Sequence, residues 1–175
     1  MKNKGFTLLE SLIVLLIMSI TTLFALPVWQ QANSQLILQK EQQKLYLFLR
    51  QVQARVENSS EIWFLIPNRN INTQHWCITA QIKLDKLCDC FNPNICPKEA
   101  QAYFYYPYFP EKTMLVSKRY YPQEVTRLSG IRDTSSSTCF VLQAENSRTL
   151  FSFFNVGSLK LKDYQVASAC VNDEA

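Results

Sequence analysis

The sequence predicts an α+β fold in which one long N-terminal helix packs on an antiparallel β-sheet. Two observations lead to this class. Apolar residues recur at helical spacing through the first third of the chain, and short aromatic and β-branched runs follow residue 60. A long helix followed by a series of strands is typical of a sheet with one face covered by helix. The 175 residues suffice for one small globular domain beside a membrane segment, and we find no internal repeat.

The first element is an apolar segment that contains one charge. Residues 6–26 have Glu10 as their single charged side chain, and as a helix they would extend about 31 Å, enough to cross a bilayer core. A carboxylate there costs about 2.5–3.5 kcal/mol on insertion scales, so Glu10 is a functional candidate. Lys2 and Lys4 precede the segment, which by the positive-inside rule places the bulk of the chain outside the cytoplasm. A secretory signal peptide fits badly, because only a poor cleavage site follows the apolar run.

Residues 4–11 read KGFTLLES, and residues 12–27 read LIVLLIMSITTLFALP. This N-terminus resembles the class III signal and first helix of type IV pilins and type II secretion pseudopilins. The resemblance implies that a prepilin peptidase cuts after Gly5 and N-methylates Phe6. It also implies that Glu10 pairs with the N-terminal amine of a neighbouring subunit, and Pro27 stands where the family often has a helix-bending proline. A generic single-pass anchor with an incidental glutamate is the alternative.

The helical pattern continues beyond Pro27 to about Asn58. Because proline removes a backbone donor and clashes with the preceding turn, we expect Pro27 to bend the helix without ending it. The buried stripe is predicted to contain Trp29, Ala32, Leu36, Ile37, Leu45, Phe48, Leu49, Val52 and Val56. The expected division of the chain is a leader at residues 1–5, a membrane or filament-core helix at residues 6–27, and a globular domain at residues 28–175 that includes the second half of the helix.

Six runs after residue 60 are predicted to be strands of the sheet: residues 61–67, 75–84, 101–109, 113–121, 139–146 and 148–156. Residues 86–100 hold three cysteines and two prolines and are excluded as a central strand. Residues 126–138 are rich in serine and threonine and are expected to form an exposed loop.

All six cysteines follow residue 76, and an even number in an exported domain favours disulfides over a metal site. Zinc bound by Cys88, Cys90 and Cys96 with His75 is the alternative, and the lack of a paired C-x-x-C weakens it. We therefore predict no metal and no cofactor. The candidates for disulfide bonding are Cys77, Cys88, Cys90, Cys96, Cys139 and Cys170. The C-terminal disulfide loop of many pilins implies the pair Cys139–Cys170, and the expected remaining pairs are Cys77–Cys88 and Cys90–Cys96.

The sequence gives no basis for an enzyme. His75 is the only histidine, no group of carboxylates has a spacing that suggests acid–base catalysis, and no serine lies in a nucleophile elbow. Three glycines are too few for a loop that holds phosphates.

The charge is not that of a strong nucleic-acid-binding domain. Two of the charges in the net +4 are Lys2 and Lys4 of the leader, so the rest of the chain carries about +2. The aromatic run YFYYPYFP, followed by SKRYY, could stack on single-stranded nucleic acid. We favour packing on the helix or a tyrosine-rich assembly interface instead. The cations that would contact nucleic acid are Lys118, Arg119, Arg127 and Arg132.

The sequence thus favours a protein similar to a minor type IV pilin of a Gram-negative bacterium, a low-copy structural subunit that helps to initiate or tip a pilus serving DNA uptake, adhesion or motility. A type II secretion pseudopilin and a membrane-anchored exported binding module are the alternatives. The expected partners are other pilin subunits, the prepilin peptidase and the assembly platform in the inner membrane, with nucleic acid as a further candidate. The expected location is the inner membrane, with the C-terminal domain in the periplasm, and then the fibre.

Overall fold

The computed structural model of the chain describes residues 8–131, 134–155 and 157–163, without the side chains of residues 24–31 and 163. Within these residues the secondary structure consists of α1 (Leu8–Glu57), β1 (Ile62–Asn70), β2 (His75–Ile82), β3 (Tyr103–Tyr105), β4 (Met114–Val116), β5 (Thr126–Ser129), β6 (Thr134–Ser135), β7 (Thr138–Ala144), β8 (Ser147–Phe153), β9 (Leu159–Asp163) and two short 3-10 helices, η1 (Pro93–Ile95) and η2 (Lys98–Ala100).

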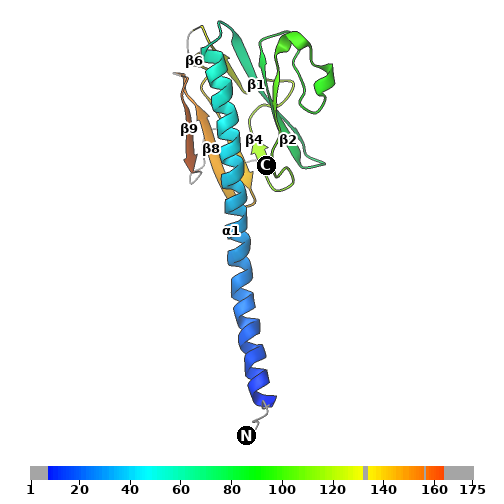
Figure 1. The fold of residues 1–175 in the computed structure, drawn as a ribbon, viewed down its shortest axis with the longest axis vertical. Coiled ribbons are helices and arrows are strands. Elements are labelled where there is room, and N and C mark those ends of the chain that lie inside the picture. Colours follow the sequence, from blue (N-terminus) through cyan, green and yellow to red (C-terminus); the bar gives the residue numbers. More distant parts are fainter. Residues whose placement is uncertain (1–7, 132–133, 156, 164–175) are drawn as a thin grey trace, which may run out of the picture.

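The long helix has two halves with different surroundings. α1 contains 50 residues, which corresponds to about 75 Å. Its C-terminal half lies along the strands, whereas its N-terminal half extends away from them alone (Figure 1). Among the described side chains of α1, burial begins at Ser34. The helix continues through Pro27 without interruption, and the bend expected at this residue stays a prediction.

The strands form two antiparallel sheets, where the sequence predicted one. The five-stranded sheet has the order β3-β2-β1-β5-β6, and the four-stranded sheet has the order β4-β7-β8-β9. β1 and β2 lie on one side of α1, and β8 and β9 lie on the other (Figure 1). The helix can serve both sheets because its contacts extend beyond one stripe: Phe48 packs on Tyr105 of β3, with 5.3 Å between the ring centroids, and Gln42 accepts a hydrogen bond of 2.9 Å from Thr149 of β8.

The core lies between α1 and the two sheets. Leu45 and Leu49 of α1 are 0% and 1% exposed, and Phe140 and Phe151 from neighbouring strands stack with their ring centroids 5.2 Å apart. Trp76 of β2 is also fully buried, and its indole N–H donates to the Thr113 hydroxyl over 3.2 Å. Apolar burial of this kind is the main stabilising contribution to a small domain.

The expected loop at residues 126–138 is wrong, because it contains β5 and β6. Thr126 and Leu128 of β5 are only 1% and 4% exposed. The next turn packs closely on the end of α1: a Cβ atom at Gly130 would lie 1.9 Å from the Ser59 carbonyl oxygen. Glycine at this position therefore allows β5 to approach the helix.

Candidate assembly helix and disulfide-bonded loop

The exposed half of α1 presents an apolar surface. The large apolar side chains described between Leu8 and Leu23 are 45–79% exposed. The hydroxyl groups in this stretch bond to the helix backbone: Thr22 donates to the Met18 carbonyl oxygen over 2.9 Å, and Ser11 donates to the Leu8 carbonyl oxygen over 2.8 Å. Such bonds satisfy the hydroxyl groups within the helix and leave its outside apolar.

Glu10 lies in the first turn of α1, on this exposed half. Gly5 and Phe6 lie outside the described residues, so cleavage and methylation stay predictions. No helix meets the length and hydropathy needed to cross a membrane within the part of the chain that the structure describes.

Two disulfides hold the cysteine-rich segment against β2, and their pairing corrects the expected one. The bonds join Cys77 to Cys90 and Cys88 to Cys96, where Cys77–Cys88 and Cys90–Cys96 were expected. Because all three cysteines of the alternative zinc site are bonded in this way, the thiolates that zinc would need are not available. The ring nitrogen Nδ1 of His75 lies 2.5 Å from the Thr73 carbonyl oxygen.

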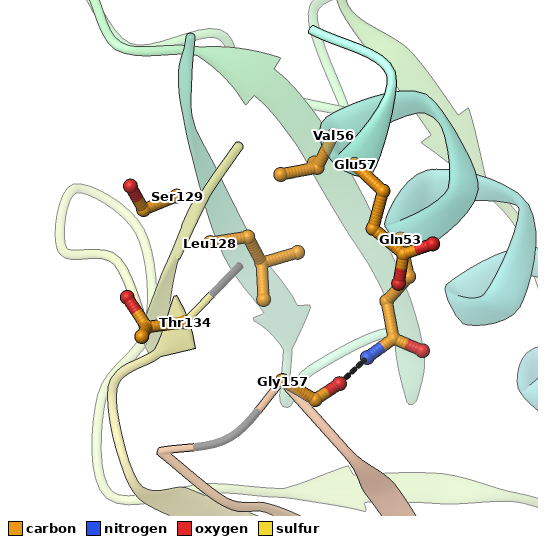
Figure 2. Close-up of a pocket in the computed structure, with 7 residues that line it drawn as sticks. All are labelled: Gln53, Val56, Glu57, Leu128, Ser129, Thr134 and Gly157. Atoms are coloured by element: carbon orange, nitrogen blue, oxygen red, sulfur yellow. Dashed lines mark hydrogen bonds between the residues drawn. The ribbon is translucent and has the colours of Figure 1, made fainter. Parts of the chain in front are cut away.

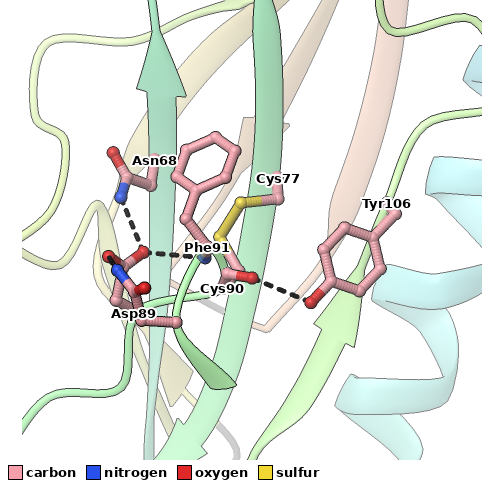
Figure 3. Close-up of a disulfide and its surroundings, with 7 residues drawn as sticks. Asn68, Cys77, Asp89, Cys90, Phe91 and Tyr106 are labelled. Carbon is pink, nitrogen blue, oxygen red and sulfur yellow. Dashed lines mark hydrogen bonds between the residues drawn. A yellow bond between two sulfur atoms is a disulfide. The ribbon is translucent and has the colours of Figure 1, made fainter. Parts of the chain in front are cut away.

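Hydrogen bonds hold Cys88 and Asp89 against the neighbouring strands, next to both disulfides. The Gln81 side chain accepts the backbone N–H of Cys88 over 2.6 Å. Asp89 accepts the Asn68 side-chain amide over 2.7 Å, which draws the next residue, Cys90, over β2 (Figure 3). The contacts come from Gln81 of β2 and Asn68 of β1, and the sequence alone does not show that these residues meet the cysteine-rich segment.

Two further features concern the surroundings of the cysteines. Tyr106, just after β3, donates its hydroxyl to the Cys90 carbonyl oxygen over 2.8 Å (Figure 3). Burial, and then the charge of Asp89, raise the pKa of Tyr106. Cys139 is disulfide-bonded, and its expected partner Cys170 lies outside the described residues.

α1 carries a buried acid that its neighbours in sequence do not reveal. Glu41 is 0% exposed, and its carboxyl oxygens accept the Tyr105 hydroxyl and the backbone N–H groups of Tyr108 (2.8 Å) and Phe109 (3.2 Å). Burial, the hydrogen bond to Glu41 and the charge of Glu41 raise the pKa of Tyr105. The expected strand at residues 101–109 is therefore wrong beyond Tyr105, because the backbone donors that would pair in a sheet bond to Glu41 instead.

Lys44, one turn further along α1, holds the same segment. Its ammonium group donates to the Tyr106 carbonyl oxygen over 2.5 Å and lies 3.5 Å from the Tyr108 ring centroid. Burial lowers the pKa of Lys44, and the charge of Glu41 offsets part of this effect. The aromatic run thus fastens the domain to α1, although Tyr106 and Tyr108 remain 46% and 65% exposed.

The candidate nucleic-acid contacts do not form a purely cationic surface. Arg127 of β5 pairs with Glu124, with 2.5 Å between Nη2 and Oε1, and its guanidinium lies 5.4 Å from the Phe64 ring centroid. Burial opposes ionisation of Glu124, but the hydrogen bond from Arg127 and the charges of Arg127 and Arg119 outweigh it and lower its pKa. Lys118 and Arg119 are exposed after β4. Arg132 lies outside the described residues.

A pocket of about 310 Å³ lies where the end of α1 meets β5, β6 and the turn before β9 (Figure 2). Gln53 crosses it and donates to the Gly157 carbonyl oxygen over 2.7 Å. Its described lining has one ionisable side chain, Glu57, and so lacks a second group for acid–base chemistry.

A family model and one relative match this chain. The model of the prokaryotic N-terminal methylation motif matches residues 1–26. A Haemophilus influenzae protein described as uncharacterized is 60% identical over 168 residues, which cover 96% of this chain and 99% of that protein. No solved structure matches. The chain therefore belongs to the type IV pilin-like proteins that carry this prepilin signal, in one family with the Haemophilus protein.

Proposed function

We propose that this chain is a minor type IV pilin, a low-copy structural subunit that helps to initiate or tip a pilus. The observation that carries the proposal is a methylation motif at the start of a helix whose apolar half is exposed beyond the domain. Exposed apolar surface costs about 25 cal/mol per Å² in water. Such a segment needs lipid before assembly and the helices of neighbouring subunits afterwards.

In this proposal, cleavage after Gly5 leaves Phe6 as the methylated first residue. Residues 6–27 occupy the inner membrane and later the fibre core, and residues 28–175 form the periplasmic domain. Glu10 pairs with the amine of a neighbouring subunit. The disulfides at Cys77 and Cys88 support the oxidising compartment, because such bonds persist in the periplasm and are rare in the cytosol.

The test is to shear the fibres from cells that make this chain and to quantify the chain by mass spectrometry. The proposal expects the chain in the fibre fraction at far lower copy number than the main subunit, and fewer fibres in cells that lack it. A chain that stays in the inner membrane of fully fibre-bearing cells, with an unchanged number of fibres in its absence, contradicts the proposal.

A further inference from the structure

A groove of about 660 Å³ lies where the last turns of α1 pass the edge of the five-stranded sheet. This volume is within the range of about 300–1,000 Å³ typical of ligand pockets. The lining consists of Gln51, Ala54, Arg55, Asn58, Ser59, Trp63, Gln101 and Tyr103. It contains one cation and no carboxyl side chain, and it is otherwise mostly amide, hydroxyl and aromatic groups.

The cation of the groove is fixed in place by neutral groups. The Arg55 guanidinium lies 4.3 Å from the Tyr103 ring centroid, and its Nη1 donates to the Tyr103 hydroxyl over 2.8 Å. Tyr103 in turn stacks on Trp63, with ring centroids 5.9 Å apart. No carboxylate of the described residues lies within ion-pair distance of Arg55. Its remaining N–H donors are therefore oriented in advance for an anionic acceptor.

Trp63 lies in the wall of the groove, but its indole N–H is enclosed by the protein. Trp63 is 3% exposed, and its indole N–H has no acceptor among the described residues. Buried polar groups nearly always form a hydrogen bond, and this N–H is too enclosed to receive one from a ligand in the groove. The indole N–H of Trp76 shows the usual arrangement, because it donates to Thr113.

The groove lies beside an unpaired strand. β3 is the terminal strand in the order β3-β2-β1-β5-β6, so one of its edges faces no other strand of this sheet. An unpaired edge can accept an extended segment of another chain through backbone hydrogen bonds.

We propose that this groove binds an extended acidic segment of a partner protein, with a carboxylate on Arg55 and the segment lying along β3. Trp63 stacks on the Tyr103 ring that carries this cation, so its enclosed indole N–H reports occupation of the groove without contacting the segment. The phosphate backbone of a nucleic acid fits less well, because it is held by several cations and the groove has one. The site goes beyond the proposed function, since it does not involve the apolar half of α1.

The test uses the full-length ¹⁵N-labelled protein in detergent micelles. The three tryptophans, Trp29, Trp63 and Trp76, give three indole N–H signals, and Trp63→Phe assigns the one of interest. The probe is an acetylated peptide of alternating valine and glutamate, and its twin has glutamine in place of glutamate. The Trp63 signal is expected to shift saturably with the glutamate peptide while the Trp76 signal stays in place. The glutamine twin should bind about tenfold more weakly.

Two variants separate the site from a general charge effect. Arg55→Gln should lower the affinity for the glutamate peptide about tenfold, because a charge-assisted hydrogen bond is lost. Arg50→Gln, on the exposed side of the same helix, should bind as the parent does, and an unchanged Trp76 signal reports that each variant is folded. Equal binding of both peptides, equal binding by Arg55→Gln, or no shift of the Trp63 signal at millimolar peptide would overturn the proposal.

Discussion

Inside the domain, the Glu41 carboxyl group accepts hydrogen bonds from three protein donors in place of water. A buried carboxyl group is costly unless it is hydrogen-bonded, and here one hydroxyl and two backbone N–H groups meet it. The two N–H groups belong to Tyr108 and Phe109, which have left the sheet. One side chain of α1 therefore fixes the path of a segment more than 60 residues away in sequence.

Replacement of Glu41 by alanine should lower the free energy of unfolding by about 3 kcal/mol, because it leaves buried donors without an acceptor. Glu41→Gln keeps one acceptor oxygen and should cost less. Urea unfolding followed by tryptophan fluorescence measures both. Gln43→Ala, on the exposed face of the same helix, should change the value by less than about 0.5 kcal/mol. A loss at Glu41→Ala no larger than that of this control would contradict the role given to Glu41.

The two glutamates show what sequence reveals at this scale. Glu10 stands out because it is the single charge in a long apolar run. Glu41 lies in the polar run QKEQQK, which is indistinguishable from a solvated helix face until the segment that contacts it is placed. A charge in an apolar environment can therefore be recognised from the sequence only when its neighbours in the sequence form that environment.

Among the secondary-structure elements, the long periodic helix was predictable from the sequence, whereas the short strands and their pairing were not. The helix expected from Phe6 to about Asn58 is described as Leu8–Glu57, and two sheets replace one. β5 and β6 were missed because their serine and threonine residues resemble a loop, although Thr126 is buried. In the aromatic run the strand ends at Tyr105, because the backbone N–H groups of Tyr108 and Phe109 bond to Glu41 and not to another strand. Each miss reflects a contact distant in sequence that overrides local preference.

The disulfide pairing can be tested by a non-reducing peptide map. Cleavage before Asp89 and after lysine separates Cys88 from Cys90. The observed pairs, Cys77–Cys90 and Cys88–Cys96, should then appear as one cluster of three linked peptides, because the peptide with Cys90 also carries Cys96.

The alternative pairing gives a different map. If Cys77 were bonded to Cys88, two linked peptides would appear beside a separate peptide closed by Cys90–Cys96. That pattern would contradict the observed connectivity. Reduction before digestion is the control, because it should release every peptide in both cases.

At the scale of the whole molecule, the chain divides into an apolar helix half and a cross-linked domain. The boundary on α1 falls before Ser34, where burial begins among the described side chains. The packed half has a buried acid and aromatic contacts, whereas the other half has exposed apolar side chains around Glu10. The methylation motif at residues 1–26 covers the second region only.

Glu10→Ala should leave cleavage intact and reduce incorporation into fibres. An unpaired partner charge in a buried interface is costly, so we expect the amount of this chain in the sheared fibre fraction to fall about tenfold or more. Ser11→Ala is a matched control, because its hydroxyl bonds to the Leu8 carbonyl oxygen of the same helix. Incorporation of Glu10→Ala at the level of Ser11→Ala would show that Glu10 does not pair in assembly.

Processing as a pilin-like protein is tested by the intact and N-terminal mass of the chain made with and without a prepilin peptidase. We expect a chain that begins at N-methylated Phe6 only when the peptidase is present. A terminus at Met1 or Lys2 in both samples would contradict it, and the chain would then be a plain membrane-anchored domain.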